Sequence, residues 1–248
     1  ILNEYLFSKC SSLKNITLPN TLTTIQPFTF NECTSLSSIN LPSSITTISE
    51  YSFCNCSNLT QINLPTSITT ISNGTFEGCS LITEIVIPSS VISIGESAFK
   101  NCSSLKEITI PDSVEIICEN SFSKCYSLTK LTIPDSVKSI GQYSFSKCKV
   151  LEEVTIDSIK TEVQKDAFQD CFLFKHLIIS SKEESLSDYS GSQYPSVIEI
   201  TFTPGIRSIG DYVFYGCSTL TKIILPPTLL SIEEHAFDGH LSIKKIKI

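Results

Sequence analysis

The sequence predicts an α/β repeat solenoid, mostly β, in which 23-residue units stack and form a parallel β-sheet along one face. Phenylalanine returns at a constant interval of 23 residues, no insertion or deletion disturbs the interval, and the one missed position is Gly191. The recurring residues are Phe7, Phe30, Phe53, Phe76, Phe99, Phe122, Phe145, Phe168, Phe214 and Phe237. Because each unit of such an array buries its apolar side chains only against its neighbours, this interval is a stronger guide to the fold than local propensity.

Length and composition limit both the fold and the function. The 248 residues are 41% hydrophobic, and we expect residues 1–248 to form a single solenoid of about ten to eleven repeats. The net charge is −7 and no long run of Lys or Arg gathers on one segment, which argues against nucleic acid as a partner. No apolar stretch reaches the roughly 20 residues that cross a bilayer, so we expect no direct membrane insertion. The chain has no methionine and begins in mid-repeat, so we expect a longer natural product.

The first part of each unit is predicted to be a short strand. In the clearest unit, Ile108-Thr109-Ile110 alternates apolar and polar side chains, as a strand with one buried face does. Pro111 then ends the strand because proline has no N–H to continue a ladder. Proline occupies the same position at 19, 42, 65, 88, 134 and 226. Stacked units therefore place their strands side by side, about 4.8 Å apart.

The second part of each unit is predicted to return the chain over a turn that contains the phenylalanine. Val114 and Ile117 supply apolar side chains, and the segment 96–101 suggests one irregular or short helical turn. Gly95, Gly141 and Gly210 stand at the bend before this turn, where we expect a positive φ. The phenylalanine rings should then form a continuous spine opposite the sheet.

Cysteine recurs with the same period as phenylalanine. Nine of the 11 cysteines lie three residues after the phenylalanine position: Cys10, Cys33, Cys56, Cys79, Cys102, Cys125, Cys148, Cys171 and Cys217. A residue that recurs at such a position points inward, where a thiol behaves as a small apolar group. Neighbouring coils would bring these cysteines within disulfide range, yet a uniform ladder selects no pairs. We therefore predict free thiols and no zinc, whose ligands surround the metal tetrahedrally. In Cys54-x-Cys56, we expect only one thiol to face inward.

The consensus Cys-Ser-x-Leu-x-x-Ile-x-Ile-Pro-x-Ser-Val-x-x-Ile-x-x-x-Ala-Phe-x-x-Cys resembles the BspA-type leucine-rich repeat, also called the Treponema-type repeat. The resemblance covers essentially the whole chain. It implies a right-handed, curved leucine-rich-repeat array with the parallel sheet on its concave face. Members of this family often lie on microbial or protist cell surfaces and are often adhesive. The family shares no catalytic residues that could be carried over to this chain.

Repeats between about residues 157 and 203 are predicted to be irregular. Asp157, Ser180 and Thr203 replace the proline that ends the strand, Gly191 replaces phenylalanine, and Tyr194 replaces cysteine. The 23-residue count nevertheless survives. We expect a looser coil in this part of the array.

Exposed strand positions are predicted to form columns along the concave sheet. One column consists of Asn15, Ser38, Gln61, Glu84, Glu107, Lys130, Glu153, His176, Glu199, Lys222 and Lys245. The charged segment Glu84, Glu107, Lys130, Glu153 and His176 is our candidate partner-binding surface; the alternative is a solvated sheet face with alternating charges. The chain has no Trp and these columns hold no aromatic residue, which argues against sugar stacking and a lectin.

Catalytic and metal-binding interpretations of the same column are disfavoured. Glu84 and Glu107 are neighbours on adjacent coils and could form a pair of catalytic carboxylates, but a smooth repeated sheet offers no pocket that excludes water. Glu153, His176 and Glu199 could contact a metal, yet exposed side chains in a row rarely preorganise one. We therefore predict no catalytic residue, no metal site and no cofactor.

Three functions remain from the sequence. The first is a cell-surface or secreted adhesion module that presents its concave sheet to a protein partner, and the second is an intracellular scaffold. The third, a β-solenoid enzyme acting on polysaccharide, is the remote alternative. Free thiols favour the intracellular alternative, whereas sequons at Asn15, Asn55, Asn58, Asn73 and Asn101 favour secretion. Both ends of the array lack polar caps, so we also expect end-to-end self-association through the terminal repeats.

Overall fold

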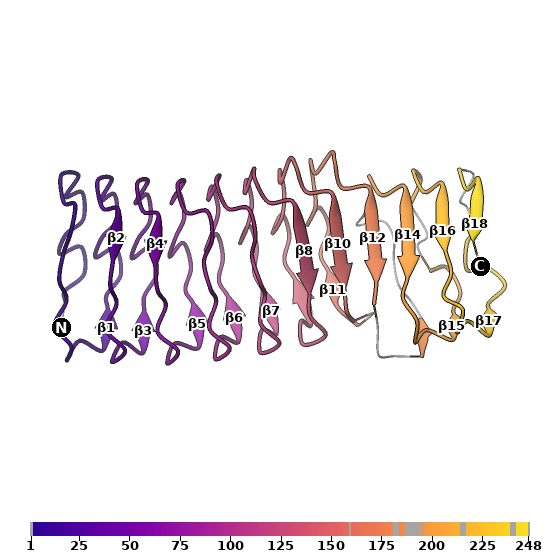
Figure 1. Cartoon of the computed structure of the whole chain (residues 1–248), viewed down its shortest axis with the longest axis horizontal. Helices are drawn as coiled ribbons and strands as arrows, with labels where there is room; N and C mark the ends of the chain where they lie inside the picture. Colours follow the sequence, from indigo (N-terminus) through magenta and orange to yellow (C-terminus); the bar gives the residue numbers. More distant parts are fainter. Residues whose placement is uncertain are drawn as a thin grey trace.

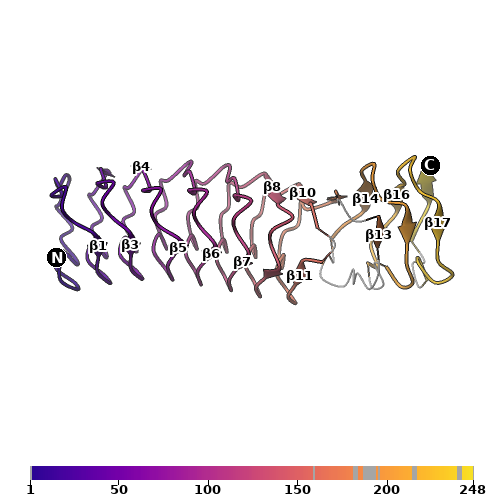
Figure 2. The same ribbon diagram turned by 90° about the horizontal axis from the view of Figure 1, so that it is seen from below.

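The protein is a parallel β-solenoid, described by a computed structural model over residues 2–158, 160–180, 184–186, 194, 196–213, 217–238 and 242–247. Its coils follow one another along the long axis, with the two termini at opposite ends (Figure 1). Seen from below after a 90° turn, the coils remain in a single row (Figure 2). The described residues contain no helix, and hence no helix that could span a membrane. The predicted solenoid of 23-residue units is confirmed, and the residues that the structure describes form strands and turns alone.

The first column of strands contains the longest strands of the molecule. It comprises β2 (Ser38–Ile39), β4 (Gln61–Ile62), β8 (Lys130–Ile133), β10 (Glu153–Ile156), β12 (His176–Ile179), β14 (Glu199–Phe202), β16 (Lys222–Ile224) and β18 (Lys245–Lys247). The last six form one parallel sheet in the order β18-β16-β14-β12-β10-β8, and β2 pairs with β4. Partner residues are 23 positions apart, as Val154 and Leu177 are, so like positions lie beside like. Figure 1 shows these strands as the upper row of arrows.

A second column of two-residue strands lies on the other side of each coil. It comprises β1 (Thr24–Ile25), β3 (Thr47–Ile48), β5 (Thr70–Ile71), β6 (Ser93–Ile94), β7 (Ile116–Ile117), β9 (Ser139–Ile140), β11 (Glu162–Val163), β13 (Ser185–Leu186), β15 (Ser208–Ile209) and β17 (Ser231–Ile232). Its sheets are β1-β3, β11-β9-β7-β6-β5 and β13-β15-β17. The sequence predicted apolar positions here but not a second sheet. Each strand is too short to show the alternation that marks a strand.

The predicted phenylalanine spine is confirmed over the N-terminal two thirds of the chain. Neighbouring rings from Phe7 to Phe168 are stacked, with centroids 5.1–5.8 Å apart and interplanar angles of 1–16°. Rings from Phe30 to Phe145 are fully buried. Phe214 and the missed position at Gly191 lie outside the described residues. In the irregular part, Phe168 instead contacts the rings of Phe174 and Tyr194, at 5.1 and 5.9 Å.

The turn that carries the phenylalanine differs from the helical turn suggested by the sequence. Residues two before and two after the ring have positive φ in most coils, for example Tyr51 (φ 53) and Asn55 (φ 56). Alternate backbone N–H groups therefore point to the next coil: that of Phe53 donates to the carbonyl oxygen of Thr75 at 3.0 Å. A helix would use the same N–H groups within the coil, so the turns instead join successive coils as a third hydrogen-bonded ladder.

The expectation of positive φ at Gly95, Gly141 and Gly210 is wrong, since none of the three has it. Space explains two of these glycines. A Cβ on Gly141 would lie 2.5 Å from the amide nitrogen of Glu119, and one on Gly95 would lie 2.8 Å from the carbonyl oxygen of Ile71. These glycines therefore allow the backbones of adjacent coils to approach closely.

The cysteines are free, as predicted, and most of those at the repeat position are buried. Cys10, in the first coil, is the exception and is exposed. The expectation that only one of Cys54 and Cys56 faces inward is wrong: both are buried. Alternating backbone conformation in this turn lets two residues separated by one both lie inside, which a strand does not allow.

Candidate functional site

The candidate site lies on the outward side of the first strand column. In β8 and β10 the side chains alternate between exposed or half-exposed and buried, with Leu131 and Val154 inside and Lys130 and Glu153 outside. The inward residues pack in the core, so the outward ones form columns along the array. We call the column that runs through Glu84, Glu107, Lys130, Glu153, His176, Glu199, Lys222 and Lys245 the sheet face.

Three of the five predicted site residues are brought into direct contact. The ammonium group of Lys130 lies 3.2 Å from a carboxylate oxygen of Glu153. The other carboxylate oxygen of Glu153 lies 3.2 Å from Nδ1 of His176. These residues are neighbours in the β8-β10-β12 register, so the contacts follow directly from the 23-residue spacing.

The ion-pair ladder continues beyond the predicted residues. Nε2 of His176 lies 2.9 Å from the hydroxyl oxygen of Thr201 and 3.8 Å from a carboxylate oxygen of Glu199. The ammonium group of Lys222 donates to the other oxygen of Glu199 at 2.8 Å. Glu199 and Lys222 belong to the same sequence column, so its alternating charge could have added them to the candidate set.

Glu84 and Glu107, the other two predicted residues, lie in a different environment. Both are exposed, and the first column has no assigned strand between β4 and β8. They line a groove of about 500 Å³ together with Gln61, Asn63 and Val86, a residue that is 82% exposed. Within the part of the chain that the structure describes, no ion pair or side-chain hydrogen bond involves either carboxylate. These two charges remain available for an external group.

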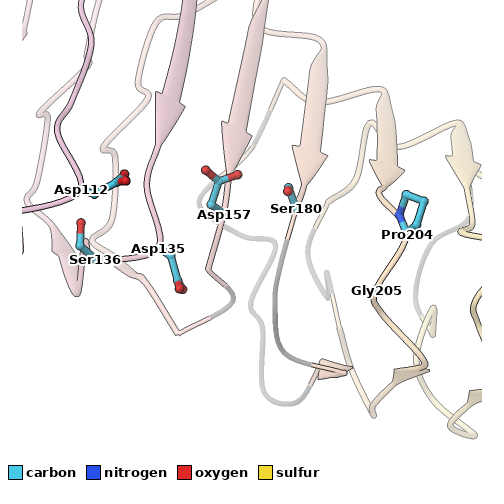
Figure 3. Close-up of a pocket in the computed structure, with 7 residues that line it drawn as sticks. All are labelled: Asp112, Asp135, Ser136, Asp157, Ser180, Pro204 and Gly205. Carbon is cyan, nitrogen blue, oxygen red and sulfur yellow. The ribbon is translucent and has the colours of Figure 1, made fainter.

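A second groove, of about 690 Å³, lies beside the turns that follow the first strand column. Figure 3 shows its lining residues distributed over successive coils: Asp112, Asp135, Ser136, Asp157, Ser180, Pro204 and Gly205. Asp157 and Ser180 occupy the position that proline holds in the regular repeats, so their side chains replace pyrrolidine rings at the groove wall. The hydroxyl of Ser136 is already used, since it donates to the carbonyl oxygen of Val114 at 2.7 Å.

Neither groove offers a set of metal ligands. No group of three or more His, Cys, Asp or Glu side chains able to hold a metal ion occurs among the described residues. The contacts that the sheet face does show are exposed or half-exposed ion pairs. Such pairs are worth about 0–1 kcal/mol each, so they order the side chains more than they stabilise the fold.

Comparison with known proteins agrees with this geometry. The profile described as BspA type leucine rich repeat region matches residues 1–83, 73–195 and 184–248. A leucine-rich repeat protein from Eubacterium ventriosum is 23% identical, with a TM-score of 0.51 over 94% of this chain and 66% of that one.

The pneumococcal vaccine antigen PcpA is 22% identical, with a TM-score of 0.52 over 94% of this chain and 71% of that one. A leucine-rich repeat protein from T. pallidum is 26% identical, with a TM-score of 0.47 over 79% of this chain and 72% of that one. No curated protein matches the sequence.

Proposed function

The chain belongs to the BspA-type leucine-rich repeat family, and from this premise we propose that it is a non-enzymatic module that binds a protein partner through its sheet face. The proposed contact residues are Glu84, Glu107, Lys130, Glu153 and His176. Residues 1–248 are proposed to form one array of about ten to eleven repeats, and end-to-end association of its terminal repeats stays a prediction.

The observation that carries this proposal is the order of the sheet face. Lys130, Glu153 and His176 contact one another along the column, which favours one arrangement of their side chains and lowers the entropy that a partner must overcome on binding. Beside them, Glu84 and Glu107 have no partner of their own among the described residues and flank the exposed Val86. A preordered polar surface with uncompensated charges at one end suits recognition of a protein with a complementary basic patch.

We further propose that the chain acts at the cell surface or in secreted form, as an adhesion or interaction protein. Family membership supports this location. The free cysteines favour the second candidate, an intracellular scaffold. Fractionation of the native cells followed by immunoblotting separates the two: signal in the surface or culture fraction supports the first, and signal confined to the soluble interior supports the second.

The binding proposal is tested with a charge reversal and a matched control. The Glu84→Lys/Glu107→Lys variant reverses two charges on the sheet face. The Glu96→Lys/Glu119→Lys variant makes the same change at the same 23-residue separation, but in the turns after β6 and β7, where both side chains are also exposed. Each protein is immobilised and exposed to extracts of the source organism and its environment, and bound proteins are identified by mass spectrometry.

We expect a protein captured by the wild type and by the Glu96→Lys/Glu119→Lys variant to be reduced at least about ten-fold on the Glu84→Lys/Glu107→Lys variant, because like charges placed against one another cost several kcal/mol. Equal capture by all three proteins would show that the sheet face is not the contact surface. Circular dichroism spectra that agree among the three exclude unfolding as the cause.

A further inference from the structure

Along the sheet face, the charges read from one end of the column are complementary to the charges read from the other end. From β18 back toward the N-terminus, the column reads Lys245, Lys222, Glu199, His176, Glu153, Lys130, Glu107 and Glu84. Basic residues thus gather at one end and acidic residues at the other, while the middle alternates. We propose that this face pairs with the same face of a second copy of the chain in antiparallel orientation, an inference that rests on the proposed role of the sheet face as the contact surface.

The symmetry of the pair follows from the column. A two-fold axis parallel to the strands and midway between β10 and β12 brings the two faces together and reverses the direction of the array. The facing pairs are then Glu84 with Lys245, Glu107 with Lys222, Lys130 with Glu199, and Glu153 with His176. Each pair occurs twice. Three of the four pairs join opposite charges, and the fourth places a carboxylate beside an imidazole, with no like charges opposed.

Other registers of the same antiparallel arrangement place like charges together. Shifting one chain of the pair by one coil in one direction brings Glu107 opposite Glu199, and Glu153 then faces Glu153 of the second copy. A shift in the other direction brings Lys130 opposite Lys222. Because directly opposed like charges are unfavourable, the column specifies one register, as alternating charges do between other paired surfaces.

The neighbouring outward column is compatible with this register. It contains Val86, Thr109, Thr132, Thr155, Ile178, Thr201, Ile224 and Lys247. Its single charge, Lys247, would meet Val86, and Thr155 would meet Ile178. Short β-branched side chains on both copies allow the two faces to approach closely. At the edge of the face, the exposed Glu152 would lie opposite Lys175, again a complementary pair.

The charges that lack partners within the chain lie at the two ends of the proposed interface. Among the described residues, no ion pair involves Glu84 and Glu107 at one end or Lys245 and Lys247 at the other. Glu84 and Lys245 are seven coils apart, about 34 Å at the spacing of parallel strands. A second copy in the antiparallel register supplies each end with the opposite charge, which a single chain cannot do.

The size of the interface predicts a weak dimer. Eight coils of about 4.8 Å and four residues of about 3.3 Å give about 500 Å² per copy, or about 1,000 Å² in all. That area lies at the lower end of specific protein interfaces. Because the contacts are charged and half-exposed, we expect the dimer to dissociate as salt rises from about 0.1 M to about 1 M, where the Debye length falls from about 10 Å to about 3 Å.

The test is a charge swap followed by sedimentation equilibrium at low salt. The Glu84→Lys/Glu107→Lys variant opposes lysines to the lysines at 245 and 222 of its copy. The Lys222→Glu/Lys245→Glu variant opposes glutamates to the glutamates at 107 and 84. We expect each variant alone to dimerise at least about ten-fold more weakly than the wild type. An equimolar mixture of the two should recover dimerisation to within about three-fold of the wild type, because every facing pair is complementary again.

Recovery in the mixture is a readout that misfolding cannot produce. The Glu96→Lys/Glu119→Lys variant, altered in the turns, should dimerise as the wild type does. A wild type that stays monomeric up to about 1 mM at low salt overturns the inference, as does a mixture that remains monomeric. If the wild type is monomeric and the Glu84→Lys/Glu107→Lys variant still loses a captured foreign protein, self-pairing is wrong while the proposed function stands. If the swap works and no foreign protein depends on the face, the second copy is its partner.

Discussion

The buried cysteines of the repeat from Cys33 to Cys171 hydrogen-bond to the main chain of the previous coil. Sγ of Cys102 donates to the carbonyl oxygen of Phe76 at 3.2 Å, and the thiols of Cys56 and Cys148 do the same to Phe30 and Phe122, at 3.1 and 3.4 Å. The same carbonyl already accepts an N–H within its own turn, as that of Phe76 does from Cys79. A thiol fits here because it fills an apolar site and offers a weak donor to a buried acceptor.

Burial also determines how these thiols titrate. Desolvation raises the pKa of Cys33, the second thiol in the ladder, from its ordinary 9.0 to about 11. Desolvation raises the pKa of Cys217 to about 12, and it places the pKa of Cys102 well above the ordinary value. The thiolate is the form that burial disfavours, so the folded state holds these protons more tightly than the unfolded chain.

We predict that the fold loses stability at alkaline pH through these thiols. Their contribution is fully present below pH 9, the ordinary thiol pKa, and is lost as pH rises toward and through the raised folded values, from about 9 to beyond about 11. Each thiol lowers the free energy of unfolding by up to about 1.4 kcal/mol per pH unit in this window. The slope is measured by urea denaturation between pH 8 and pH 11.

The Cys102→Ala variant isolates one thiol from the other groups that titrate in this range. Its slope against pH should be shallower than that of the wild type by one thiol's share, although its stability at pH 7 is lower. Identical slopes for the two proteins would mean that Cys102 does not hold its proton on folding.

At the level of elements, the close approach of adjacent coils explains why glycine occupies positions where the backbone does not have a positive φ. Gly141 follows β9, donates its N–H to the carbonyl oxygen of Ile117 at 2.8 Å, and faces the backbone of Cys118 and Glu119. Added volume here meets main-chain atoms, which cannot move aside as a flexible side chain can.

We therefore predict that Gly141→Ala destabilises the protein by about 1–3 kcal/mol, the usual cost of overpacking. The sign of this change in the free energy of unfolding distinguishes close packing from an open position. At an unstrained position with negative φ, the same change would stabilise by about 0.4–1 kcal/mol through the unfolded state. Urea denaturation measures the difference, and Gln142→Ala, at the next residue, serves as the control with an expected change within about 0.5 kcal/mol. A more stable Gly141→Ala variant would refute the close approach.

The elements differ in how far the sequence could predict them. The first strand column was predictable because proline ends each strand and alternation precedes it, as at Ile108-Thr109-Ile110. The turn was not, because no residue type marks its positive-φ positions: Tyr51, Glu32 and Lys124 all adopt this conformation. Their backbone is held by hydrogen bonds to the next coil, which is a tertiary effect that local propensity does not contain.

The site was predictable as a column but not as a set of contacts. The 23-residue count alone puts Lys130, Glu153 and His176 on adjacent strands. Which end of each side chain meets which neighbour depends on rotamers, and the sequence does not determine these. The loss of regular pairing around Glu84 and Glu107 was also not predictable, since Ile85 and Ile108 keep the strand pattern.

For the whole molecule, the coupling between coils is uneven along the axis. The first strand column runs unbroken from β8 to β18, but within the described residues the second column has no pairing between β11 and β13. At this junction Phe168 is the last ring of the regular stack, with its centroid 5.4 Å from that of Phe145. On its other side it contacts the tilted rings of Phe174 and Tyr194. In an array stabilised by neighbour contacts, such a junction is where the two parts separate first.

We predict that Phe168→Ala splits unfolding into two transitions, because it removes the aromatic contact across a junction over which the described residues of the second column are unpaired. The expected loss is about 3–5 kcal/mol, and the part beyond β12 should unfold at lower urea. Phe122→Ala removes the same buried ring where Ile116↔Ser139 pairing keeps the second column continuous, so it should lower the midpoint of a single transition. Hydrogen exchange locates the effect: amides of β14 and β16 should lose protection in Phe168→Ala while those of β9 keep it. If Phe168→Ala instead unfolds in a single transition, with the same dependence of unfolding free energy on urea as the wild type, then the first column alone couples the whole array.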